Sequence, residues 1–300
     1  MSMKAQDAFG TVLTAMVTPF TPDGSKIDFD KAAQLANDLV ELGNNGLVIN
    51  GTTGESPTTD EHEKLELLKC VVSAVGDRAK VIAGAGSNDT AHSVLLAKDA
   101  AAAGAHGLLV VTPYYNKPPQ AGVIAHMHAV ADATDLPVMV YDIPGRAGIP
   151  ITTDSLIKLS EHRNIIANKD AKADVWSASE VMAKSDLAYY SGDDGLNLAL
   201  LAVGAVGVVS VTGHIVADRH KAMVDAMQSN DVETARQINR SLVPITEGVM
   251  TKAGGAIMVK AALDLLGRVG GGALRLPLVP ATESQVAQLR VDLALGGFNL

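Results

Sequence analysis

Short apolar runs alternate with segments of helical periodicity along almost the whole chain. The apolar runs contain many β-branched residues and are bounded by glycine or polar residues, which favours buried strands. The predicted strands cover residues 12–18, 47–50, 81–84, 108–112, 138–141, 165–169, 188–191 and 208–211. The predicted helices cover residues 28–42, a segment from about 59, 90–103, 120–134, 153–160, 174–185, 193–203 and a region beyond 217.

Strand and helix therefore alternate through eight units, which favours an α/β fold of the closed (β/α)8 type, a TIM barrel, over an open doubly wound sheet. The glycine fingerprints of nucleotide sites, G-x-G-x-x-G opening a helix and G-x-x-x-x-G-K-[ST], do not occur. Three joints share a weak repeat in which one glycine closes a helix and a second precedes an apolar strand. These joints are Gly43-x-x-Gly46, Gly104-x-x-Gly107 and Gly204-x-x-Gly207.

No linker rich in Pro, Gly and Ser divides the chain. We expect the barrel and its active site in residues 1–216. Residues 217–300 are expected to form the last barrel helix and a C-terminal helical extension, because this stretch is longer than one barrel helix requires. Breaks are predicted at Gly254-Gly255 and at Gly270-Gly271-Gly272.

Charge and composition narrow the possible partners. The net charge of −9, without a cluster of basic residues, argues against nucleic acid and anionic membranes. The uncharged stretch from Gly195 to Gly213 is broken by internal glycines, which favours a buried helix and strand over a membrane span. One cysteine, Cys70, excludes an intramolecular disulfide, and no secretory signal opens the chain, so we expect a cytoplasmic protein.

One predicted buried strand ends on a lysine, Lys169. Active sites of barrels lie at the carboxyl ends of the strands. Burial there would lower the pKa of the lysine amine, and the neutral amine could attack a carbonyl to form a Schiff base. The alternative is a lysine that reaches solvent or pairs with Asp170 or Asp174.

Other polar side chains also stand where predicted strands end: Thr52, Thr53, Tyr115, Tyr141 and Arg146. Singly, the threonines are typical of turns, Tyr115 of a surface aromatic and Arg146 of a surface ion pair. In a barrel, however, these strand ends meet at one face. Hydroxyl groups can relay protons to a Schiff base without adding charge, and an arginine fork suits a substrate carboxylate.

Five segments in order carry these residues: Gly51-Thr-Thr-Gly-Glu-Ser56, Val111-Thr-Pro-Tyr-Tyr-Asn-Lys-Pro118, Tyr141-Asp-Ile-Pro-Gly-Arg146, Lys169-Asp-Ala-Lys-Ala-Asp174 and Ser191-Gly-Asp-Asp194. With them the chain resembles the dihydrodipicolinate synthases, also called 4-hydroxy-tetrahydrodipicolinate synthases. That family belongs to the pyruvate-dependent class I aldolases, with N-acetylneuraminate lyase. The resemblance runs from about Gly10 to the C-terminal helices. It implies a barrel, a homotetramer built as a dimer of dimers, no metal and no organic cofactor.

The resemblance implies a lyase of lysine and diaminopimelate biosynthesis, whose substrates are pyruvate and L-aspartate 4-semialdehyde. Lys169 would condense with pyruvate to give an enamine that attacks the aldehyde. Tyr141 would donate and accept protons beside the lysine. Thr52 and Tyr115 would complete the relay, with Tyr115 reaching in from the neighbouring subunit.

Substrate binding is also implied by the resemblance. Thr53 and the backbone at Val209 would hold the pyruvate carboxylate, with Gly192 also in the substrate site. Arg146 would bind the carboxylate of the semialdehyde, and it favours a synthase because the sialic acid lyases lack an arginine in this loop. The alternative within the class is another enamine-type lyase, acting on N-acetylneuraminate or on a 2-keto-3-deoxy sugar acid.

Some features leave other interpretations open. Ala167-Asn168 replaces the family's usual glycine and apolar residue before the lysine, and a buried amide would need partners. Asp193 and Asp194 are expected to cap the following helix instead of binding a metal. A barrel that only binds or regulates, and a metal-dependent aldolase, are the alternatives from other classes.

Overall fold

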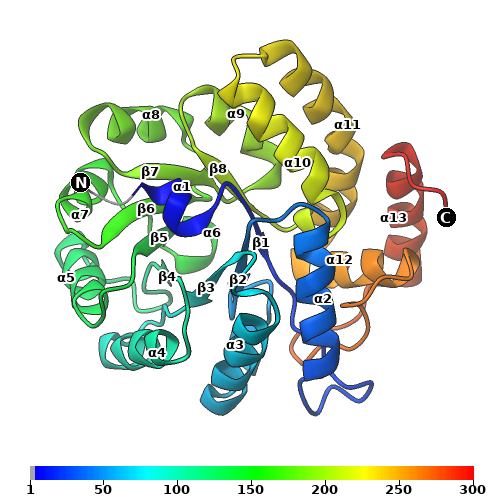
Figure 1. Ribbon diagram of the computed structural model, residues 1–300, viewed down its shortest axis with the longest axis horizontal. Helices are drawn as coiled ribbons and strands as arrows, with labels where there is room; N and C mark the ends of the chain where they lie inside the picture. Colours follow the sequence, from blue (N-terminus) through cyan, green and yellow to red (C-terminus); the bar gives the residue numbers. More distant parts are fainter. Residues whose placement is uncertain (1–3) are drawn as a thin grey trace.

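A computed structural model describes residues 4–300 and shows a closed barrel of eight parallel strands in sequence order (Figure 1). The strands are β1 (Val12–Ala15), β2 (Gly46–Ile49), β3 (Lys80–Gly84), β4 (Gly107–Val111), β5 (Val138–Asp142), β6 (Ile165–Asp170), β7 (Ala188–Ser191) and β8 (Gly207–Ser210). The barrel closes where Leu13 on β1 pairs with Val209 on β8. The predicted fold class is therefore confirmed.

Helices surround the strands and continue past them (Figure 1). They are α1 (Ala5–Phe9), α2 (Phe29–Glu41), α3 (Glu61–Val75), α4 (Thr90–Ala102), α5 (Gln120–Ala131), α6 (Pro144–Ala147), α7 (Thr153–Ser160), α8 (Val175–Lys184), α9 (Asn197–Ala202), α10 (Gly213–Gln228), α11 (Val232–Met250), α12 (Gly255–Leu265) and α13 (Glu283–Leu295). Two short 3₁₀ turns, η1 (Ser56–Thr58) and η2 (Asp194–Leu196), follow β2 and β7.

The strands are buried on both faces, as expected of a parallel sheet covered by helices. One apolar cluster fills the space between the strands and the helices. A second fills the barrel itself, with Leu13, Val48, Ile82, Met139 and Val209 among its members. Alternation along each strand thus decides which side chains point into the barrel.

The repeated glycine joints have two physical causes. The first glycine of each joint, at Gly43, Gly104 and Gly204, adopts a positive φ that ends the preceding helix. The second glycine opens a strand close to the N-terminal segment, where a β-carbon on Gly46 or Gly107 would overlap Phe9. Helix α1, which the sequence did not predict, thus closes the barrel at the amino ends of the strands.

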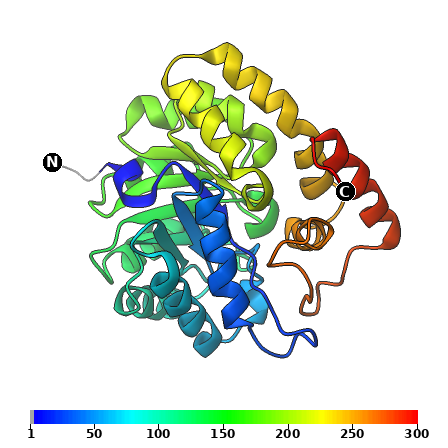
Figure 2. The same cartoon turned by 45° about the vertical axis from the view of Figure 1, so that its right-hand side comes forward.

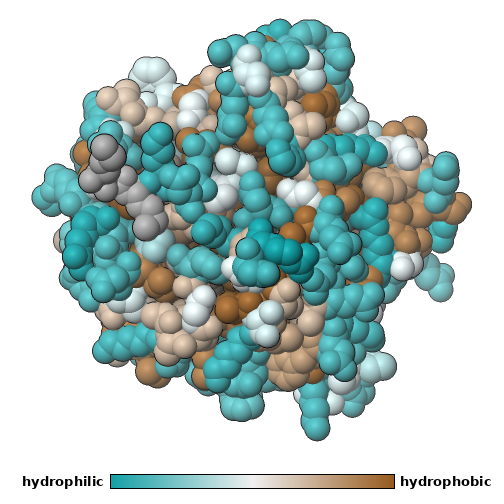
Figure 3. Space-filling model, viewed as in Figure 1, coloured by the Kyte–Doolittle hydropathy of each residue, from teal (hydrophilic) through white to brown (hydrophobic). Residues whose placement is uncertain are grey.

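Three helices extend beyond the ring. In Figure 2 α11, α12 and α13 lie outside the barrel helices, on the side of α2 and α10. The predicted breaks are confirmed, because α12 begins at Gly255 and residues 270–272 lie between α12 and α13. Figure 3 shows a largely hydrophilic face with apolar positions gathered over α13.

The uncharged stretch from Gly195 to Gly213 forms α9 and β8, as predicted. Strand β1 ends at Ala15, earlier than predicted, and only the Met16 N–H extends its ladder, to the Val48 carbonyl at 3.0 Å. Among residues 4–300, no helix combines the length and the apolar character that a membrane crossing requires.

Candidate active site

Lys169 lies near the carboxyl end of β6 and points into the barrel. Only 5% of its surface is exposed. It pairs in register with Tyr141 on β5, and its Nζ atom lies 4.1 Å from the centroid of the Tyr141 ring. The predicted pair of lysine and tyrosine therefore shares one buried space. The alternative of a lysine that reaches solvent is wrong.

Burial changes the acid–base properties of both side chains. Burial, assisted by the positive charge of Arg146 and opposed by Asp194, lowers the pKa of Lys169 from 10.5 to about 7. Burial also raises the pKa of Tyr141 to about 12. At neutral pH a large fraction of the lysine is therefore a free amine, beside a phenol that keeps its proton.

Gly192 follows β7 and contacts the lysine side chain. A β-carbon at Gly192 would lie 2.8 Å from Cγ and 2.9 Å from Cε of Lys169. Such distances are shorter than van der Waals contact, so only glycine leaves room for the lysine in this position. The structure thus gives Gly192 a packing role that the sequence alone did not suggest.

Thr52 and Thr53 lie in a tight, half-buried loop after β2. The loop is bounded by two residues in the left-handed region, Asn50 with φ of 60° and Glu55 with φ of 57°. Inside it, the Glu55 N–H donates to the Thr52 carbonyl at 3.1 Å, and the Thr18 hydroxyl donates to the Gly54 carbonyl at 2.6 Å. The threonines are therefore held by their backbone at the end of β2.

Tyr115 and Arg146 lie in two adjoining loops, after β4 and β5. The Tyr115 N–H donates to the Ala147 carbonyl at 3.3 Å, which links the two loops. Tyr115 has φ of 74° and its surface is 87% exposed, so its own barrel covers little of its side chain. Arg146, in the short helix α6, is also exposed, yet its charge acts on both Lys169 and Tyr141.

The buried carboxylate of Asp194 holds the loop after β8. From the sequence, this residue was expected only to cap the following helix. Asp193 does cap η2, since its side chain accepts from the Gly195 N–H at 2.9 Å. Asp194 instead accepts from the N–H groups of Val211 and Thr212, at 2.9 and 2.8 Å. Val209, on the strand before this loop, is buried inside the barrel.

His214 lies next to the same loop and is a structural residue. Its Nδ1 donates to the Val211 carbonyl at 2.7 Å, and its Nε2 accepts from the Val17 N–H at 3.0 Å. Burial lowers its pKa to about 4, so the ring is neutral at physiological pH. It thus joins the end of β1 to the loop after β8.

Asn168, the unusual residue before the lysine, points out of the barrel and is fully buried. It pairs in register with Tyr189, which is also buried. The side-chain amide and the Tyr189 hydroxyl are neighbours. Burial raises the pKa of that hydroxyl and the amide opposes the rise, but within residues 4–300 the two groups do not reach the geometry of a full hydrogen bond. In the described part of the chain, the buried amide therefore has the Tyr189 hydroxyl as a polar neighbour but no fully formed hydrogen bond.

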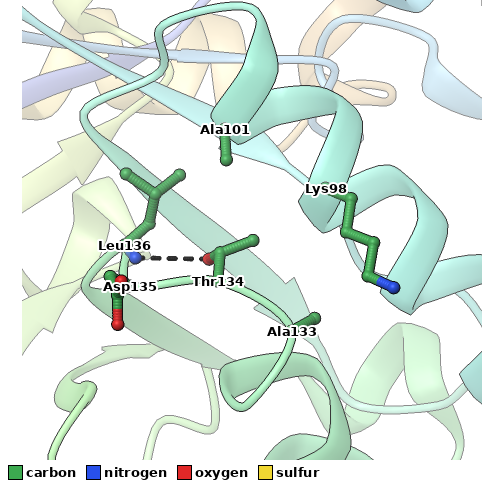
Figure 4. A pocket seen from close by; sticks show the side chains of 6 residues that line it. All are labelled: Lys98, Ala101, Ala133, Thr134, Asp135 and Leu136. Atoms are coloured by element: carbon green, nitrogen blue, oxygen red, sulfur yellow. Dashed lines mark hydrogen bonds between the residues drawn. The ribbon is translucent and has the colours of Figure 1, made fainter.

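One hollow of the molecule lies away from these side chains. The hollow in Figure 4, of about 470 Å³, lies between α4 and the segment before β5, at the amino ends of the strands. The candidate catalytic side chains Lys169 and Tyr141 lie at the carboxyl ends. Within the described residues, no three His, Cys, Asp or Glu side chains are grouped as metal ligands.

Known proteins similar to this chain agree with one another. The profile of the dihydrodipicolinate synthetase family matches residues 8–295. The 4-hydroxy-tetrahydrodipicolinate synthase 2 of Streptomyces coelicolor is 57% identical over 98% of this chain and 98% of its own length.

Solved structures show the same likeness. The structure of the Cyanidioschyzon merolae enzyme with lysine bound has a TM-score of 0.94 at 42% identity, covering 97% of this chain and 99% of that one. The chloride-inhibited dihydrodipicolinate synthase of Acinetobacter baumannii, complexed with pyruvate, has a TM-score of 0.91 at 34% identity, covering 96% and 98%. The chain therefore belongs to the dihydrodipicolinate synthetase family.

Proposed function

We propose that this chain is a lyase that condenses pyruvate with L-aspartate 4-semialdehyde to form 4-hydroxy-tetrahydrodipicolinate, through a Schiff base on Lys169. The observation that carries the proposal is the buried lysine amine, with its pKa near 7, against the face of Tyr141. The names of the relatives and the pyruvate bound to one of them support the choice of reaction.

The neutral amine of Lys169 attacks the keto carbon of pyruvate, and the carbinolamine loses water to give an iminium. Loss of a proton from the methyl group yields an enamine, whose carbon attacks the aldehyde of the second substrate. The amino group of that substrate then displaces the lysine by closing the ring. Each turnover thus returns Lys169 to its free state.

Tyr141 is the group placed to move protons in these steps, because its ring lies against the lysine amine. With its pKa raised to about 12, the phenol is a donor at neutral pH and takes a proton back when a stronger base forms beside it. Thr52 and Tyr115 extend the relay, and Tyr115 serves the site of a neighbouring subunit.

The substrate carboxylates bind at two places. Thr53 and the backbone at Val209 hold the carboxylate of pyruvate. Gly192, which has no side chain, leaves space for the substrate beside Lys169. Arg146, exposed in the loop after β5, binds the carboxylate of the semialdehyde through its guanidinium fork.

Shared sites require an oligomer, and we infer a homotetramer arranged as a dimer of dimers. Support comes from Tyr115, an aromatic side chain that is 87% exposed in a left-handed backbone conformation. Such strain at a projecting residue is typical of a functional position.

Two assays on one preparation test the reaction: pyruvate consumption with L-aspartate 4-semialdehyde, coupled to a reductase, and pyruvate release from N-acetylneuraminate. We expect turnover only in the first assay. Lys169→Ala should abolish it, and Arg146→Ala should reduce kcat/KM for the semialdehyde by about tenfold or more, as loss of a charged hydrogen bond implies.

Arg163→Ala is the matched control, because Arg163 is an exposed arginine before β6 whose partner is Asp135. It should leave both kinetic constants unchanged. Turnover of N-acetylneuraminate, or full activity in Lys169→Ala, would contradict the proposal.

A further inference from the structure

A buried ion pair joins the loop that carries Thr52 and Thr53 to the C-terminal helices. Glu55 Oε1 accepts from Nζ of Lys260, on α12, at 2.6 Å. The two side chains are 0% and 1% exposed. Each side chain of the pair makes a further hydrogen bond. Lys260 donates to the Ala273 carbonyl at 2.7 Å, and Glu55 Oε2 accepts from the Arg275 backbone N–H at 2.9 Å. An ion pair of this kind is rigid because each charge is satisfied by more than one partner.

Arg275 makes a second set of contacts between the C-terminal segment and the chain after β2. Its guanidinium binds both carboxylate oxygens of Glu63, on α3, at 2.6 Å. Three carbonyl groups accept its remaining donors, those of Gly24, Ser25 and Thr58 at 2.8, 3.0 and 2.9 Å. Thr58 belongs to η1, directly after the loop, so the segment between α12 and α13 holds the loop from outside.

The two cations also enclose an aromatic ring. Lys260 Nζ lies 4.5 Å and the Arg275 guanidinium 4.4 Å from the ring centroid of Phe20, which is 3% exposed. Cation–π contacts of this kind favour a fixed position of both charges. Phe20 therefore helps to fix the positions of Lys260 and Arg275, and these two residues in turn hold the loop after β2 through Glu55 and Thr58.

The loop needs such support because of its backbone. Glu55 has φ of 57°, a conformation that disfavours side chains with a β-carbon and persists where the surroundings determine it. The Glu55 N–H also bonds to the Thr52 carbonyl, so a rotation at Glu55 moves the threonine. The side-chain bonds of Glu55 to the C-terminal segment are the contacts that oppose that rotation.

We propose that Lys260 and Glu55 are positioning residues for Thr52 and Thr53, and that the C-terminal helical extension thereby acts as part of the active site. The proposal rests on the function inferred above. It predicts that breaking the ion pair misplaces the threonines without removing any group that touches the substrate.

The experiment compares purified full-length Lys260→Met, the double variant Glu55→Gln/Lys260→Met, and Leu289→Ala. Leu289 is fully buried in α13, where it lies beside Gly248 of α11, so its truncation is a destabilised control. Melting temperature, KM for pyruvate and the rate of borohydride trapping of pyruvate are measured for each.

Lys260→Met should lower the melting temperature, because it leaves the Glu55 carboxylate buried without a counter-ion. It should also raise the KM for pyruvate by about tenfold, since small displacements of positioning groups are costly. In the double variant the melting temperature should recover toward that of the wild type while the KM stays high. Leu289→Ala should lose stability with an unchanged KM.

A folded Lys260→Met, or a folded double variant, with KM and trapping rate within about twofold of the wild type would overturn the inference, because twofold is well under the loss that misplacement produces. So would a KM that changes in Leu289→Ala as much as in the ion-pair variants. A wild-type protein that traps no pyruvate on Lys169 would instead contradict the proposed function, which separates the two failures.

Discussion

At the level of single residues, the proposed chemistry depends on how Lys169 is enclosed. The side chain enters the barrel beside Tyr141, is limited by Gly192, and is influenced by the charge of Arg146. Burial makes the amine neutral enough to react, and the neighbouring phenol keeps its proton. Two predictions follow from this arrangement, one electrostatic and one steric.

The rate of Schiff-base formation should follow the ionisation of Lys169. We expect the rate of borohydride trapping with pyruvate to rise with pH through a midpoint of about 7, because only the neutral amine attacks. Arg146→Gln removes a charge that lowers this pKa, so its midpoint should lie higher. Arg163→Gln should leave the midpoint in place. The ordinary pKa of a lysine side chain is about 10.4. A midpoint near that value, unaffected by Arg146→Gln, would therefore contradict the argument that burial lowers the pKa of Lys169.

Adding one methyl group beside the lysine should be costly. In Gly192→Ala the new carbon must displace Lys169 Cγ and Cε, and overpacking of this kind costs about 1–3 kcal/mol. If that cost falls on the reactive geometry, kcat/KM for pyruvate drops by about tenfold to a hundredfold. Gly145→Ala, which meets no atom within 4 Å, is the steric control and should retain activity. Equal kinetic constants in both variants would contradict a steric role for Gly192.

At the scale of elements, β5 and β6 divide their residues between two environments. Tyr141 and Lys169 face the barrel interior, and the next residues, Asp142 and Asp170, face the helices. These aspartates are 0% and 1% exposed. Asp142 accepts from the Ile151 N–H at 3.0 Å and lies 3.5 Å from Nζ of Lys172. The acids thus tie the strand ends to the segments that follow them.

Asp142 should make stability depend on pH. Burial raises its pKa from 3.8 to about 6, so between these values the folded chain binds more protons than the unfolded chain. Its contribution to the free energy of unfolding therefore falls as pH rises from about 4 to 6, by on the order of 3 kcal/mol at most. Asp142→Asn should remove that fall, which urea denaturation of both proteins across this range would measure. Parallel stability curves for the two proteins would show that the aspartate is not so perturbed.

The strands and most helices could be predicted from apolar runs and helical periodicity, because burial on both faces leaves a clear local pattern. Helices α1 and α6 were missed, since five and four residues are too few to show a period. The polar residues at strand ends were found for the same local reason. Lys260, by contrast, reads as an ordinary lysine of an apolar helix.

At the scale of the whole molecule, three parts far apart in sequence complete the barrel. Helix α1 closes its amino end, the C-terminal segment holds the loop after β2, and Tyr115 is exposed in the loop after β4. Contacts across 205 residues, as between Glu55 and Lys260, leave no periodic signal in a single sequence. The position of the C-terminal extension therefore required the structure.

A site shared between subunits can be tested by mixing inactive chains. In a dimer of one Lys169→Ala chain and one Tyr115→Phe chain, one of the two sites combines an intact lysine with an intact tyrosine. We expect that unfolding and refolding the two variants together restores part of the activity that each lacks alone. No recovery, with mixed oligomers present, would mean that Tyr115 serves its own chain.

Reductive trapping shows whether Lys169 forms the covalent bond with pyruvate. The protein is incubated with pyruvate, reduced with borohydride, digested and analysed by mass spectrometry. We expect the peptide containing Lys169 to gain the mass of pyruvic acid less one water plus two hydrogens, and Lys169→Ala to gain nothing. An adduct on another lysine, such as Lys172, or no adduct in an active preparation, would contradict it.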